Sequence, residues 1–113
     1  MTTGKIWGKT EAVLQNPLVE FHRIDVKEGY RCSAHRHKHK WNLFYVVSGE
    51  LAIHVMREGH PDDITMLKAG DHTAVAPGVY HEFRCWKDCV AFELYYPEAL
   101  SEDIERLDVG GRW

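Results

Sequence analysis

Residues 29–49, GYRCSAHRHKHKWNLFYVVSG, contain the pattern on which the fold prediction depends. His35, His37 and His39 stand at alternate positions with basic residues between them, and an apolar run follows Asn42. Alternate residues of an extended chain project to one side. Because imidazole is a common ligand of transition metals, this stretch predicts a metal site beside the start of a strand.

Glycines frame this stretch at fixed intervals. Five residues separate Gly29 from His35, four separate His37 from Asn42, and six separate Asn42 from Gly49. A second pattern follows in residues 70–85, GDHTAVAPGVYHEFRC, where a glycine precedes a Pro-Gly pair and a histidine. One His-x-His pair would be a weak signal, whereas two glycine-anchored patterns in order are specific.

Together the two patterns resemble the two motifs of the cupin superfamily, G-x5-H-x-H-x(3,4)-E-x6-G and G-x5-P-x-G-x2-H-x3-N. The resemblance extends from Gly29 to Cys85, about half of the chain. Three positions depart from the motifs. Asn42 replaces the glutamate, Ala76 replaces the proline and Cys85 replaces the asparagine.

The resemblance implies a divalent metal in the mouth of a small barrel. Carried over position by position, the ligands would be His35, His37 and His81, with Asn42 at the glutamate position. Zinc, nickel, manganese and iron are the candidate metals. His39 shares the parity of the other two and is an alternate ligand, although the glycine spacing favours a role as a neighbour in the pocket.

Asn42 changes the charge expected at such a site. An amide oxygen can coordinate a divalent ion but lacks the formal charge of a carboxylate. Three neutral imidazoles and an amide would leave both charges of the ion uncompensated. We therefore expect a small, polar and anionic partner molecule, such as a carboxylate, an enolate or a phosphate.

Short strand-like runs separated by turn residues predict an all-β fold in one domain, residues 1–113. Together with the resemblance they indicate a double-stranded β-helix, the cupin or jelly-roll barrel. Tight turns are expected at Ser48–Gly49 and at Lys87–Asp88. One short C-terminal helix is expected after Pro97, with Ser101 as its N-cap and Gly110 as its stop.

The remaining chemistry-bearing residues have no motif context. His22 and His54 are expected to be ordinary surface or hydrogen-bonded residues, Glu82 an outward charge and Lys40 a solvated side chain. The three cysteines are expected to be free thiols. A nucleophilic pair of Cys32 with a histidine is a minor alternative to the metal site.

Composition narrows the class of protein. The formal charge of −3 argues against a nucleic-acid-binding surface. No stretch has the length and apolarity of a signal peptide or a membrane span, so a cytoplasmic location without membrane contact is expected. A homodimer joined through sheet edges is expected, because the strand KTEAVL at residues 9–14 would otherwise leave an edge open.

Function follows less directly, because the cupin resemblance covers both enzymes and binding proteins. Segments 40–55 and 76–83 are similar to small RmlC-like cupins and to the barrel of mannose-6-phosphate isomerase/guanylyltransferase enzymes. This favours a sugar, sugar-phosphate or sugar-acid isomerase that uses the ion as a Lewis acid. A non-catalytic carbohydrate-binding or sensing module and a three-histidine iron dioxygenase stay open, so the sequence does not decide whether the chain is an enzyme.

Overall fold

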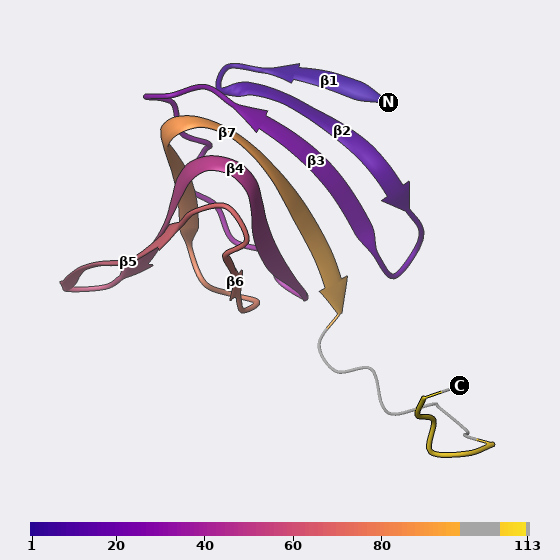
Figure 1. The fold of residues 1–113 in the computed structure, drawn as a ribbon. Coiled ribbons are helices and arrows are strands. Elements are labelled where there is room, and N and C mark those ends of the chain that lie inside the picture. The colour runs from indigo at the N-terminus through magenta and orange to yellow at the C-terminus, as the bar shows by residue number, and fades with distance from the viewer. Residues whose placement is uncertain (98–106, 113) are drawn as a thin grey trace.

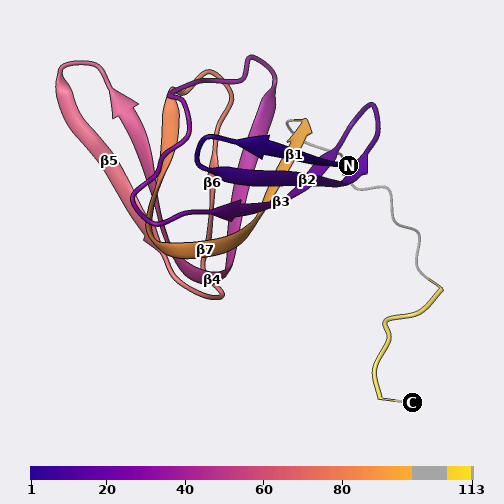
Figure 2. The same cartoon turned by 90° about the horizontal axis from the view of Figure 1, so that it is seen from above.

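The computed structural model describes residues 1–97 and 107–112, and this part of the chain contains seven strands and no helix (Figure 1). All seven strands belong to one antiparallel sheet with the order β1-β2-β3-β7-β4-β5, and β6 pairs with β4. The strands are β1 (Thr2–Lys5), β2 (Gly8–Gln15), β3 (Glu20–Val26), β4 (Lys40–Arg57), β5 (His60–Leu67), β6 (His72–Val75) and β7 (His81–Pro97). The sheet curls over on itself, so the predicted all-β jelly roll is confirmed (Figures 1 and 2).

Two long strands, β4 and β7, pair along most of their length and bend together near their middle. Register shifts interrupt their pairing between Val46 and Leu51. Gly49 lies in this bend with φ +84°, and a Cβ atom there would approach the Asp88 carbonyl oxygen to 2.1 Å. The bend therefore requires glycine at this position.

The two predicted tight turns are wrong, because Ser48–Gly49 and Lys87–Asp88 lie inside continuous strands. A hairpin turn and a bulged strand both place glycine at positive φ, so the local sequence does not distinguish them. Here the bulge lets β4 and β7 bend sharply without ending. The inward side chains of both halves then meet in a single core that includes Ile24, Phe44, Leu51, Ile53 and Phe83.

The N-terminal edge also differs from expectation. β2 contains the strand KTEAVL and pairs with β1 on one side and with β3 on the other, so that strand leaves no open edge.

The expected C-terminal helix begins at residues that lie outside the described part of the chain. Residues 107–112, which are described, contain no helix. Within the described ranges no helix could cross a membrane.

Candidate metal centre

The histidine stretch is extended but belongs to none of the seven strands. It runs beside the start of β7, where His35 N–H donates to the His81 carbonyl (3.0 Å) and His81 N–H donates to the His35 carbonyl (2.9 Å). Gly78 N–H donates to the His37 carbonyl at 2.7 Å. This backbone pairing brings the two sequence motifs, 46 positions apart, into register.

The pairing gathers three of the predicted ligands. The ligand atoms of His35, His37 and His81 all lie within 4.8 Å of one another. The ring centroids are 4.7 Å apart for His35 and His81, and 5.0 Å apart for His35 and His37. Three imidazoles this close can coordinate one ion.

Hydrogen bonds orient two of these rings. Nδ1 of His81 lies 2.9 Å from the Val79 carbonyl, and Nδ1 of His35 lies 2.7 Å from the Ser33 carbonyl. A carbonyl only accepts, so each Nδ1 carries the proton and each Nε2 keeps its lone pair. Nε2 of His37 is buried and has no hydrogen-bond partner among the described residues.

The electrostatics favour neutral imidazoles. Burial, and then the charges that His35 and His81 would carry, lower the pKa of His37 to about 4. Burial also lowers the pKa of His81, although its hydrogen bond to the Val79 carbonyl opposes the shift. Neutral imidazoles are the form that binds a metal.

Asn42 lies beside this cluster, as the motif predicts. Its side chain is 1% exposed, and its Oδ1 is 3.1 Å from Nε2 of His81. When Nδ1 of His81 carries the proton, Nε2 of His81 and Oδ1 of Asn42 both present lone pairs, and a cation between them would be attracted by both. The residues present therefore fit a metal ion.

The sequence reasoning missed Glu93. This residue is 7% exposed and faces inward from β7 on the same side as Ala91. Burial raises the pKa of its carboxyl group, and contacts with Tyr95 and Asn42 oppose that rise. A glutamate at an inward position of an otherwise apolar strand was the available signal, because a buried charge needs a partner.

A cavity of about 320 Å³ opens at this site and is lined by His35, His37 and Glu93. Lys40 also lines the cavity, and its side chain is 45% exposed, as expected for a solvated residue. Its ammonium group is 3.7 Å from the Glu20 carboxylate. His22 Nε2 is 3.5 Å from the same carboxylate, so the rim has an acidic side chain, Glu20, next to two basic ones, Lys40 and His22.

Two sequence alternatives lose support. His39 is exposed in a bend and is not part of the three-histidine cluster. Cys32 lines the cavity, but its thiol accepts a hydrogen bond from Phe83 N–H at 3.1 Å. Burial raises the pKa of this thiol to about 12, which keeps it protonated and poorly nucleophilic at neutral pH.

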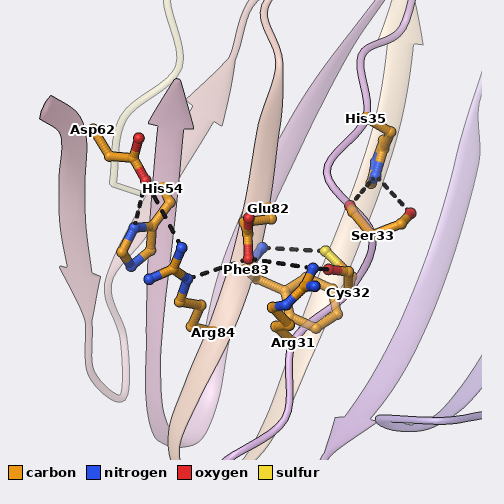
Figure 3. A network of polar contacts seen from close by, with 9 residues as sticks. All are labelled: Arg31, Cys32, Ser33, His35, His54, Asp62, Glu82, Phe83 and Arg84. Atoms are coloured by element: carbon orange, nitrogen blue, oxygen red, sulfur yellow. Dashed lines mark hydrogen bonds and ion pairs between the residues drawn. The ribbon is translucent and has the colours of Figure 1, made fainter. Parts of the chain in front are cut away.

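A network of charged side chains holds the segment that precedes His35 (Figure 3). The Glu82 carboxylate forms ion pairs with Arg84 Nε at 3.2 Å and with Arg31 Nη1 at 3.7 Å. Arg31 Nη1 also donates a hydrogen bond to the Cys32 carbonyl at 3.2 Å. Asp62 contacts Arg84 and His54 on the far side of the network. His54 and Glu82 are each 5% exposed, so the expectation of outward-facing charge was wrong for Glu82.

Solved structures share this fold. An RmlC-like cupin from Shewanella frigidimarina is 28% identical with a TM-score of 0.70, and the match covers 83% of this chain and 81% of that one. KdgF from Halomonas sp. is 20% identical with a TM-score of 0.68, over 80% and 81% of the chains. Bacillus subtilis oxalate decarboxylase, described for its Mn(II) centers, is 16% identical with a TM-score of 0.66, over 82% of this chain and 26% of that one.

No curated protein matches the chain. The family comparison is more decisive than single structures, because it covers the segments that carry the three imidazoles, the amide and the buried carboxyl group. The Cupin_2 family model, described as a cupin domain, matches residues 22–95, and the chain therefore belongs to the cupin family.

Proposed function

We propose that this cupin binds one divalent transition metal through His35, His37 and His81, with Asn42 as the fourth contact. The support is the convergence of three imidazole nitrogens within 4.8 Å and the unpartnered Nε2 of His37. Zinc, nickel, manganese and iron all suit imidazole ligands, so the metal is left to experiment.

We further propose that the protein isomerises a sugar, a sugar phosphate or a sugar acid in the adjoining cavity. A divalent ion held by His35, His37 and His81 would supply a Lewis acid that polarises a carbonyl group of the substrate. Glu93 takes the proton from the hydroxyl-bearing carbon beside that carbonyl and returns it to the former carbonyl carbon, while the hydroxyl proton passes to the former carbonyl oxygen, so the carboxylate is regenerated. The observation that carries this proposal is one buried carboxyl group, that of Glu93, lining the same cavity as two of the three imidazoles, His35 and His37.

The rim of the cavity fits a polar, anionic molecule. Lys40 is partly neutralised by Glu20 and lies 5.0 Å from the centre of the Tyr95 ring. An incoming carboxylate or phosphate can exchange places with Glu20 as the partner of this ammonium group. The same carboxylate of Glu20 can then accept a hydroxyl of the substrate.

Metal content is the first test. Untagged protein is analysed by mass spectrometry for bound metal, and the expected value is one ion per chain. His35→Ala should lose the ion, whereas His39→Ala should keep it. Retention of the ion by His35→Ala would contradict the proposed ligand set.

Proton exchange is the second test. Candidate sugar phosphates and uronates are incubated in D₂O, and deuterium entering the carbon beside the carbonyl is followed by NMR. Glu93→Gln should abolish exchange and keep the ion. Glu82→Gln is the matched control, because Glu82 is equally buried on the same strand but belongs to the network outside the cavity.

One observation favours a second candidate. The three-histidine cluster contains no carboxylate ligand, and some iron dioxygenases use such a site. Oxygen consumption by the iron-loaded protein would support that reaction. A ligand that binds without deuterium exchange or oxygen consumption would instead support a binding or sensing module.

A further inference from the structure

A second cavity adjoins the one that contains His35 and His37. It measures about 600 Å³ and is lined by residues 5–7 and 29–33. Half of these lining residues also line the first cavity; they are Lys5, Trp7, Cys32 and Ser33. The two cavities are therefore neighbouring parts of one groove, and a molecule held at the imidazoles can extend into the second part.

Backbone hydrogen bonds hold the segment that lines the second cavity. Gly29 N–H donates to the Cys85 carbonyl at 2.9 Å, and Cys85 N–H donates to the Tyr30 carbonyl at the same distance. Cys32 N–H donates to the Phe83 carbonyl at 3.2 Å. Figure 3 shows how this segment continues past Ser33 to the first histidine of the metal centre. The second cavity is thus built on backbone that is already paired with β7.

The charged side chains that line the second cavity are both cationic. They are Lys5 and Arg31, and no carboxylate stands among the lining residues. Within the described part of the chain Lys5 has no ion-pair partner. An anionic group that enters here would meet two positive charges and no repelling one, which favours its binding.

Arg31 keeps donors for such a group. Its side chain is 61% exposed, and Nη1 makes both of its polar contacts with the described residues, to Glu82 and to the Cys32 carbonyl. Glu82 also pairs with Arg84 at 3.2 Å, so two guanidinium groups share one carboxylate. Nε and Nη2 of Arg31 therefore stay available, and together they match the geometry of a carboxylate or a phosphate.

Two aromatic rings accompany the cations. Trp7 is held edge-on against Phe83, with ring centroids 5.0 Å apart and an interplanar angle of 86°. Tyr30 is 45% exposed. Small-molecule sites typically combine aromatic walls with a few placed polar groups. The faces of a sugar ring present C–H groups that pack on such walls, so this cavity fits a sugar ring that carries an acid group.

The spacing of the two cavities sets the length of the molecule. Isolated bridges join His35 to His81 and Arg31 to Arg84. The three-residue step from position 81 to position 84 of β7 advances about 10 Å. A single sugar ring is shorter than this step, whereas two linked sugar units are long enough to reach from the imidazoles to the guanidinium group.

We propose that the second cavity binds a further sugar unit with its acid group, so that the molecule bound by this protein is an acidic oligosaccharide of two or more units. This inference rests on the proposed function, because it places the carbonyl end of the molecule at the three imidazoles. Lys5 and Arg31 bind the carboxylate of the further unit, and Trp7 and Tyr30 contact its ring. These side chains determine chain length and take no part in the proton transfer.

Another groove that Arg31 lines is a weaker candidate for the same role. It shares no lining residue with the cavity at the imidazoles. Glu28 lines it and would repel an acid group. Its second guanidinium group, that of Arg84, is already paired with both Glu82 and Asp62. A molecule bound there would have neither access to the imidazoles nor an uncompensated cation.

The test is calorimetric titration of the full chain with uronates of one, two and three units and with neutral oligosaccharides of the same lengths. The uronate trimer should bind at least about tenfold more tightly than the monomer, and the neutral trimer should show no such gain. Lys5→Gln and Arg31→Gln should each weaken trimer binding about tenfold and leave monomer binding unchanged. Lys68→Gln and Arg23→Gln, exposed cations outside both cavities, are the matched controls and should bind like the wild type.

The melting temperature of each variant verifies that it is folded. Should Arg31→Gln fail to fold, Lys5→Gln decides alone, because its side chain pairs with no charged group within the described ranges. Equal affinities for monomer and trimer would overturn the proposal, as would a trimer affinity that neither folded variant lowers. A hexose phosphate that binds as tightly as the trimer, and loses as much affinity in both variants, would also overturn it in favour of a phosphate site.

The deuterium-exchange experiment separates this inference from the proposed isomerisation. Exchange with the monomer, without tighter binding of the trimer, would remove the second sugar unit and leave the isomerisation standing. Tighter binding of the trimer that depends on Lys5 and Arg31, without exchange, would remove the isomerisation and leave the second cavity as an oligosaccharide site.

Discussion

Gly49 offers the sharpest test of how the sheet turns its corner. In Gly49→Ala the new Cβ atom would meet the Asp88 carbonyl oxygen at 2.1 Å and the Cys89 Cα atom at 2.7 Å. Both are backbone atoms of β7, so the two strands must separate. A side chain at φ +84° costs about 1 kcal/mol, and forced repacking adds about 1–3 kcal/mol.

Gly29→Ala is the matched control, because Gly29 has φ +83° and a Cβ atom there would meet nothing within 4 Å. Gly29→Ala should lose only the conformational part of the stability, about 1 kcal/mol in the free energy of unfolding. Thermal unfolding of the metal-free proteins, followed by circular dichroism, measures the loss of stability in both variants. A melting temperature lowered by about 4–8 °C in the control, and by at least twice that in Gly49→Ala, is expected. Equal losses would refute the steric account of the corner.

Three further outcomes follow from the candidate site and the core. Metal-free protein should lose stability as the pH falls from about 6.5 to about 4, because the pKa of His37 is lowered to about 4 in the fold and the unfolded chain binds the proton more readily. Thermal melts across this window verify the direction, and an unchanged melting temperature would contradict it. Burial raises the pKa of Cys32 and Cys89 to about 12 and that of Cys85 to about 11, so a thiol reagent at pH 8 should label the folded protein slowly and label three thiols after unfolding. Asn42→Glu should bind a divalent ion at least about tenfold more tightly in calorimetry, because a carboxylate is the stronger ligand; an unchanged affinity would remove the charge argument.

The sequence predicts the fold and the clustering of the three imidazole side chains, and it does so for a physical reason. Motif spacing fixes which backbone segments meet, and the pairing of His35 with His81 is a backbone property. The resemblance therefore located three side chains that lie 46 positions apart or less in the chain. It also predicted the location of Asn42 beside them, with its Oδ1 at 3.1 Å from His81.

Other features depend on neighbours that the local sequence does not reveal. Glu82 looks like an outward charge by parity, yet Arg31 and Arg84 cover it. Gly49 looks like a hairpin turn, yet it is a corner because β7 lies against it. Glu93 stands among apolar residues, and only the register of β7 against β3 and β4 places it at the cavity.

The position of Glu93 changes the charge balance expected from Asn42. The motif glutamate would contact the ion directly, whereas in the proposed site the carboxyl group comes from β7 and the fourth contact would be a neutral amide. If an ion binds as proposed, Glu93 can balance one of its charges while its oxygens stay free of coordination. A carboxylate outside the coordination shell can still accept and return a proton, which a bound carboxylate does poorly. Asn42 at the position of the motif glutamate therefore need not remove a charge from the proposed site, because the residue that would hold the ion is then separate from the residue that would move the proton.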